Sequence, residues 1–143
     1  MNLFTTRRLV EFSHTDAAGV VHFSEYARYF ESAEHEFLRS HGLSVSMQHG
    51  GRHLSWPRAS LDFDFFHPLR FEDEVAIELG VERIGTTSAT YLAEFYLKGR
   101  LCAKGRCTTV CCEMADNEMN CVDIPTSFRK ALSTILLDAD RDT

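Results

Sequence analysis

The sequence has no long apolar run. No stretch approaches the roughly 18 consecutive apolar residues that a membrane-spanning helix needs, so we expect no membrane-spanning segment. Residues 1–8 also lack the charged segment and the apolar core that together make a secretory signal peptide. We therefore expect a cytoplasmic protein.

An excess of positive charge is also missing. Lysine and arginine contribute 15 residues against 21 from aspartate and glutamate, which gives a formal net charge of −6. Nucleic-acid binding depends on neutralising phosphates with cationic side chains, and no polybasic run is present to attract an anionic membrane surface. The charge balance therefore disfavours nucleic acid and membrane as partners.

None of the five cysteines belongs to a CxxC pair. Their odd number argues against a closed disulfide framework, and no metal-ligand spacing is present, so we expect no metal site. No activating base stands beside a cysteine in the sequence, as a thiolate nucleophile would require. We expect buried or half-buried free thiols at Cys102, Cys107, Cys111, Cys112 and Cys121, the adjacent pair pointing to opposite faces of a strand.

The composition that is present is that of an ordinary globular protein, with 44% hydrophobic and 25% charged residues among 143. A chain of this length usually forms one domain with a substantial core. We expect a single domain over residues 1–143, in which about 138–143 form a polar tail.

A long helix is predicted near the N-terminus. Apolar side chains recur at spacings of three and four residues from Tyr26 to Leu38, as on one helical face. Ser24 is the expected N-cap, and Gly42 is the expected stop signal. Before the helix, residues 8–12 partly alternate polar and apolar side chains, which predicts a first strand.

Strand-like segments fill most of the remaining chain. Such strands, joined by short turns, must bury one face, and the only large partner is the early helix. We therefore predict an α+β fold, with a curved antiparallel sheet of about five to six strands wrapped around one long central helix. The expected strands are 59–65, 74–81, 88–97 and 106–114, with a loop at 48–52 and a short amphipathic segment at 127–137.

The stretch Asp16–Tyr26, DAAGVVHFSEY, resembles the signature of the 4-hydroxybenzoyl-CoA thioesterase family. Residues 68–74, PLRFEDE, look like that family's turn between strands, and residues 81–85 resemble its next turn. The matches occur in order and span about residues 8–113. The resemblance implies a hotdog fold and hydrolysis of acyl-CoA thioesters.

The resemblance also assigns roles at the start of the helix. Asp16 either attacks the thioester carbonyl or activates the attacking water, and the backbone N–H of Phe23 supports the oxyanion. The chemistry agrees, because a carboxylate serves as nucleophile or general base and a helix N-terminus offers free N–H groups. Val20 and Val21 are expected to form an apolar wall that raises the basicity of the carboxylate. Gly19 is expected either to have positive φ or to permit close backbone approach.

Other positions are candidates for contact with the substrate. His22 stands where relatives have an aromatic residue. It either assists proton transfer or contacts the acyl group, or it is a partly exposed replacement for an aromatic lid. Tyr26 is expected in the core, with its hydroxyl near the site. Glu31 matches a position near the polar end of the acyl group in the family, while Glu34 and Glu36 are expected to be solvated or interfacial. Trp56 either stacks on a flat acyl group or is an ordinary core residue.

The residues that would bind the phosphates of coenzyme A are the least defined feature of the predicted site. Aryl-CoA relatives place a basic cluster where this chain has Gly85-Thr86-Thr87, so an acyl-carrier-protein thioester is an alternative substrate. The available cations are Arg83, Arg58, Arg70, Lys104 and Arg106.

The function predicted from the sequence is hydrolysis of an aromatic or short to medium acyl-CoA thioester to free acid and coenzyme A. Coenzyme A belongs to the substrate, and no separate cofactor is expected. The alternatives are an acyl-carrier-protein thioesterase, a non-catalytic acyl-thioester binding module and a hotdog dehydratase. An exposed sheet edge and the resemblance together predict a homodimer or homotetramer with sites at the subunit interface.

Overall fold

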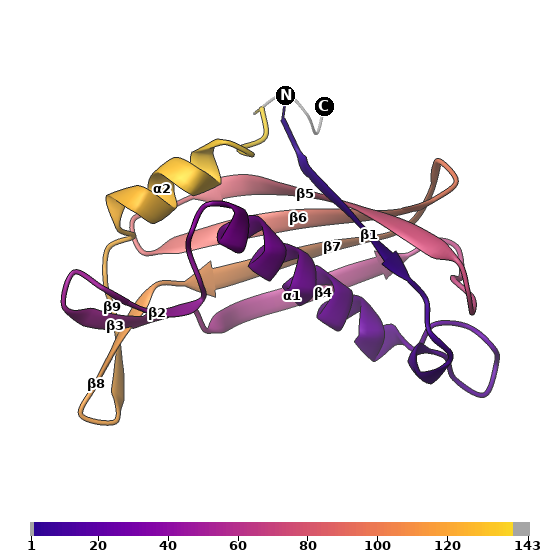
Figure 1. Cartoon of the computed structure of the whole chain (residues 1–143), viewed down its shortest axis with the longest axis horizontal. Coiled ribbons are helices and arrows are strands. Elements are labelled where there is room, and N and C mark those ends of the chain that lie inside the picture. The colour runs from indigo at the N-terminus through magenta and orange to yellow at the C-terminus, as the bar shows by residue number, and fades with distance from the viewer. Residues whose placement is uncertain (1, 139–143) are drawn as a thin grey trace.

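The computed structural model describes residues 2–138 and has a large sheet wrapped around a long helix, with a smaller sheet at one end (Figure 1). The main sheet is antiparallel with strand order β1-β5-β6-β7-β4, and the small sheet has the order β2-β3-β8-β9. The main strands are β1 (Phe4–Leu9), β4 (Arg58–Phe65), β5 (Glu74–Ile84), β6 (Ser88–Leu97) and β7 (Arg100–Val110). The others are β2 (Ser46–His49), β3 (Arg52–Ser55), β8 (Cys112–Ala115) and β9 (Glu118–Cys121), and the helical elements are η1 (Phe12–His14), α1 (Phe23–Ser40) and α2 (Thr126–Ser133).

Helix α1 forms where the apolar spacing predicts it and packs its apolar face on the main sheet. Its buried face carries Tyr26, Tyr29, Phe30 and Phe37, and burying each such side chain stabilises the fold by about 1.5–3 kcal/mol. The predicted stop is confirmed, because Gly42 has a φ of +72° just after the helix. α1 is therefore the central helix of the prediction.

The number of strands is larger than predicted. The main sheet has five strands, and the small sheet adds four more within residues 2–138. The predicted loop at 48–52 is wrong, because two glycines with positive φ at its centre, Gly50 and Gly51, close the β2–β3 hairpin. The predicted strand 106–114 is two strands, separated at Cys111, where the chain passes from one sheet to the other.

The two ends of the chain also differ from the prediction. β1 lies at Phe4–Leu9 rather than residues 8–12, because its ladder with β5 ends where Leu9 pairs with Glu74. At the other end, helix α2 stops at Ser133, and the chain then bonds to β5 through Leu137 N–H and Val81 O at 2.8 Å. Of the predicted polar tail, residues 139–143 lie outside the described residues.

The edge strand β4 pairs with β7 along its length and also contacts α1 through an aromatic side chain. Phe63 pairs with Gly105 of β7, and a Cβ added at Gly105 would lie only 2.7 Å from Cδ1 of the Phe63 ring. The same ring packs against Tyr26 and Phe30 of α1, with centroid separations of 6.2 and 6.1 Å. The absence of a side chain at position 105 therefore leaves room for the Phe63 ring of β4, which contacts the helix.

A buried ion pair joins α1 to the start of β4. Glu34 is only 1% exposed, and Arg58 donates to both of its carboxylate oxygens, with Nη1 at 2.8 Å from Oε2. The prediction of a solvated or interfacial Glu34 is wrong, because a partner from a distant strand satisfies the buried charge. Glu31 lies on the outer side of the same guanidinium, at 3.5 Å.

None of the helices within residues 2–138 is both long enough and apolar enough to cross a membrane.

Candidate active site

Asp16 begins a tight turn just before α1. The Gly19 N–H donates to the Asp16 carbonyl at 2.9 Å, and the Asp16 N–H donates to the Val20 carbonyl at 2.9 Å. Gly19 has a φ of +79°, and a Cβ added there would meet no atom within 4 Å. Positive φ, and not close backbone approach, is therefore the reason for glycine at this position.

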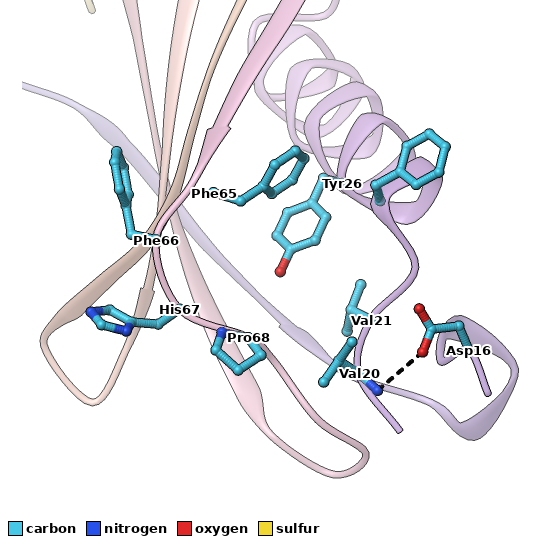
Figure 2. A pocket seen from close by; sticks show the side chains of 9 residues that line it. Asp16, Val20, Val21, Tyr26, Phe65, Phe66, His67 and Pro68 are labelled. Carbon is cyan, nitrogen blue, oxygen red and sulfur yellow. Dashed lines mark hydrogen bonds between the residues drawn. The ribbon is translucent and has the colours of Figure 1, made fainter. Parts of the chain in front are cut away.

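The Asp16 carboxylate is oriented by its own turn. Its Oδ1 accepts the N–H of Ala18 at 2.9 Å and that of Val20 at 3.4 Å, the latter drawn as a dashed line in Figure 2. No hydrogen bond from the described residues 2–138 reaches Oδ2. Asp16 is exposed in the single chain, so one oxygen holds the geometry and the other is accessible to a ligand.

The start of α1 is capped by His22. Its Nδ1 accepts the Ser24 N–H at 3.2 Å, so the predicted cap at Ser24 is wrong. The ring also stacks on Phe23, with centroids 4.5 Å apart. Within the described part of the chain, the N–H of Phe23 has no acceptor, as expected for the first residue of a helix. The His22 side chain is thus the N-cap of α1, and the backbone N–H of Phe23 is the donor that is left free.

Backbone pairing brings the Asp16 turn to the helix start. Thr15 and Val21 form an antiparallel bridge, and the His22 N–H donates to the His14 carbonyl at 2.9 Å. The Val21 N–H donates to the carbonyl of Leu69 at 2.8 Å. This last bond also joins the helix start to the segment that follows β4.

A cavity of about 370 Å³ opens at this point, and Figure 2 shows Asp16 on one side of it and the end of β4 on the other. Most of its walls are apolar or aromatic. Burial, with a smaller effect from Cys102, raises the pKa of Tyr26 to about 12, so the phenol stays protonated at neutral pH. The lining residues are Asp16, Val20, Val21, Phe23, Tyr26, Phe65, Phe66, His67 and Pro68.

Four of these lining residues, 65–68, were not among the predicted site residues, because the sequence indicated only the end of a strand at residue 65 and a turn from residue 68. The Phe65-Phe66 pair at the end of an alternating strand was the available signal, because alternation would place only one of two adjacent apolar residues in the core. Both rings are half exposed in the single chain.

The structure separates the remaining candidates from this cavity. Glu31 lines a second cavity of about 200 Å³ together with Arg58. Trp56 is buried against Phe128, with ring centroids 5.2 Å apart, and Arg83 is exposed at the far end of β5. Within one chain, none of these three side chains reaches Asp16, and their predicted contacts with substrate stay predictions.

Comparison with known proteins is consistent with this geometry. The family model of the thioesterase-like superfamily matches residues 10–132. The chain belongs to this superfamily. The predicted hotdog fold is thereby confirmed, apart from the strand count.

Individual known proteins are similar to this chain over most of its length. A 1,4-dihydroxy-2-naphthoyl-CoA hydrolase of Prochlorococcus marinus (strain MIT 9303) is 33% identical over 109 residues, which is 71% of this chain and 72% of that protein. Among solved structures, a gentisyl-coenzyme A thioesterase is 25% identical, with a TM-score of 0.77 over 90% of this chain and 98% of its own. A 1,4-dihydroxy-2-naphthoyl-CoA thioesterase from Synechocystis shares the fold, with a TM-score of 0.80, 21% identity and 99% coverage of both chains.

Proposed function

We propose that this superfamily member is an acyl-CoA thioesterase that releases a free acid and coenzyme A. The observation that carries the proposal is the meeting of Asp16 and Phe23 on the wall of one cavity. One supplies an accessible carboxylate oxygen and the other a free N–H at a helix N-terminus. Thioester hydrolysis needs this pair of groups on either side of a carbonyl.

The substrate carbonyl oxygen accepts the Phe23 N–H, and the positive end of the α1 dipole favours the negative charge that develops on it. Two routes then lead to the same products. In one, Asp16 Oδ2 attacks the carbonyl carbon, and the C–S bond breaks to release the coenzyme A thiolate. Water then hydrolyses the resulting mixed anhydride to the free acid and the Asp16 carboxylate, and the proton set free goes to the thiolate. In the other, Asp16 takes a proton from water, the hydroxide attacks, and the coenzyme A thiolate leaves and is protonated.

Within this mechanism, we propose an aromatic acyl group, in keeping with the resemblance to the 4-hydroxybenzoyl-CoA family. Tyr26, Phe65 and Phe66 supply flat apolar walls, and a cavity of about 370 Å³ accommodates a ring. His67 is half-buried on the side opposite Asp16 and offers a hydrogen bond to a ring substituent (Figure 2). The relatives named for naphthoyl-CoA and gentisyl-CoA support an aromatic class.

We further propose that the active unit is at least a homodimer. β4 is an edge of the main sheet, and its Leu61 and Phe65 side chains are 46% and 51% exposed. An exposed apolar edge strand is a surface that a second copy can pair with and cover. Covering it also shields the cavity beside Asp16 from water. Light scattering should give a dimeric or larger mass that Leu61→Asp reduces; a monomeric wild type contradicts this proposal.

The test of the activity is release of free thiol from a panel of aromatic, short and long acyl-CoA thioesters. Wild type should turn over at least one aromatic substrate. Asp16→Asn keeps an Oδ1 acceptor for the turn and should lose about 10²–10⁴-fold in kcat, whereas Asp16→Ala loses the turn bonds as well. Inactivity of wild type on every thioester, or full activity of Asp16→Asn, would contradict the proposal.

Adding acyl-carrier-protein thioesters to this panel, and measuring acyl-CoA binding, separates two of the alternatives. Turnover of acyl-carrier-protein thioesters in preference to coenzyme A thioesters would favour the carrier-protein alternative, which the lack of cations at Gly85–Thr87 motivates. Tight binding of an acyl-CoA without turnover would instead indicate a binding module. Full activity of enzyme dialysed against a chelator would support the prediction that no metal is needed.

A further inference from the structure

The β8–β9 hairpin places two cysteines directly opposite each other. Its two-residue turn is Asp116–Asn117, and both residues have positive φ, at 51° and 62°, as in a type I′ turn. Counting along the ladder from this turn, the fourth pair is Cys112 with Cys121. Hydrogen-bonded and non-hydrogen-bonded pairs alternate along an antiparallel ladder, beginning with a hydrogen-bonded pair beside such a turn.

Cys112 and Cys121 are therefore a non-hydrogen-bonded pair. The next position along confirms this alternation, because the Val122 N–H donates to the Cys111 carbonyl at 2.9 Å. In non-hydrogen-bonded pairs the Cα atoms lie about 4.5 Å apart, and the two side chains leave the same face of the sheet. A disulfide needs a Cα separation of about 4.4–6.8 Å, so this pair can be joined without moving the backbone.

The surroundings make the two thiols unequal. Cys121 is exposed on the edge strand β9, whereas Cys112 is only 3% exposed. Burial, and then the neighbouring Cys121 thiol to which it is hydrogen-bonded, raise the pKa of Cys112. Cys111 is buried as well, but it lies between β7 and β8 and is not part of the β8–β9 ladder, whereas the register places Cys112 opposite Cys121.

We propose that Cys112 and Cys121 form a reversible intramolecular disulfide when the protein meets a small-molecule disulfide. The exposed Cys121, as thiolate, attacks one sulfur of the reagent and expels the first small thiol. The Cys112 thiol then loses its proton, attacks Cys121 in this mixed disulfide, and expels the second small thiol. Two protein thiols are oxidised, and one reagent disulfide is reduced to two thiols.

This disulfide would hold the edge strand β9 covalently to β8. All four residues of β9 are exposed, and β8 is its only partner strand among the described residues. The hairpin lies at the opposite end of the molecule from η1 and the start of α1, as Figure 1 shows. The inference therefore rests on the hairpin alone and does not depend on the proposed thioesterase activity.

The experiment treats the purified full chain with oxidised glutathione under native conditions and follows its intact mass. The expected product is a monomer lighter by about 2 Da, reversed by dithiothreitol. Cleavage after Glu113 and Glu118 locates the bridge, because those cuts leave Cys112 and Cys121 on fragments that only a disulfide holds together.

Two variants decide the pairing. Cys121→Ser changes an exposed residue, should fold normally and should abolish the loss of mass. The matched control, Cys111→Ser, should retain this loss of mass. A bridge that survives Cys121→Ser, a covalent dimer through Cys121, or a wild type that gains only a glutathione adduct would overturn the inference.

Discussion

The Phe23 N–H can be deleted without removing the helix that presents it. Phe23 is the first residue of α1, the position at which proline is best tolerated because its N–H is unused by the helix. The preceding residue, His22, already has φ −65° and ψ 139°, within the region that a residue before proline requires. Phe23→Pro therefore removes one backbone donor and leaves the local conformation intact.

The size of the effect follows from the role of that donor. A single oxyanion donor is typically worth about 10²–10³ in kcat, or about 2.7–4 kcal/mol of transition-state stabilisation. KM should change little, because the donor acts mainly on charge that develops in the transition state. The phenyl ring is also lost, but it is 69% exposed, so its removal should change the free energy of unfolding by no more than about 0.5 kcal/mol.

Phe23→Ala is the matched control, since it removes the ring and keeps the N–H. Thiol release gives kcat and KM for both variants, and thermal unfolding checks that both are folded. The proline variant should fall at least about 10²-fold below the alanine variant in kcat. Equal kcat values in two folded variants would refute the assignment of the oxyanion site to this N–H.

Three further predictions concern stability. Glu34→Ala should lower the free energy of unfolding by about 2–3 kcal/mol in chemical denaturation, which is less than for a fully buried pair because the Arg58 side chain is 30% exposed. Glu31→Ala, on the outer side of the same arginine, should lower it by less than about 1 kcal/mol. Equal losses in the two variants would contradict this prediction. Burial, with smaller effects of nearby charges, raises the pKa of Tyr29 from 10.0 to about 12. The contribution of the protonated Tyr29 to the free energy of unfolding is therefore fully present below pH 10 and is lost as the pH rises towards 12. A fall in stability of the same size in Tyr29→Phe would argue against this cause. Gly19→Ala should cost about 1 kcal/mol and Gly19→Asn less, because asparagine tolerates positive φ; equal melting temperatures for wild type and Gly19→Ala would contradict the requirement for positive φ.

The parts of the molecule that the sequence predicts well are those set by local patterns. The spacing from Tyr26 to Leu38 defines α1, and the alternation in residues 88–97 defines β6 with the same bounds. One side of the cavity is also predictable, because Asp16, Val21 and Phe23 lie within a single continuous signature.

The parts that escape prediction depend on partners distant in the chain. The other cavity wall comes from residues 65–68, and nothing local indicates that they meet the helix start. Glu34 was expected near solvent because its partner, Arg58, lies 24 residues away on β4. β1 could not be placed from alternation alone, because its register is set by pairing with β5. The small sheet consists of four-residue strands, which are too short to show a clear period. The expectation of one domain over residues 1–143 stays a prediction.

The contact between Phe63 and Gly105 also constrains how sequences of this family can diverge. A side chain at position 105 would need the volume that the Phe63 ring occupies, so a larger residue there is compatible only with a smaller one at position 63. Because the same ring supports Tyr26 on the cavity wall, such an exchange would also change the shape of the cavity. Relatives that differ at these two positions should therefore differ at both together, and their acyl preferences should diverge along with them.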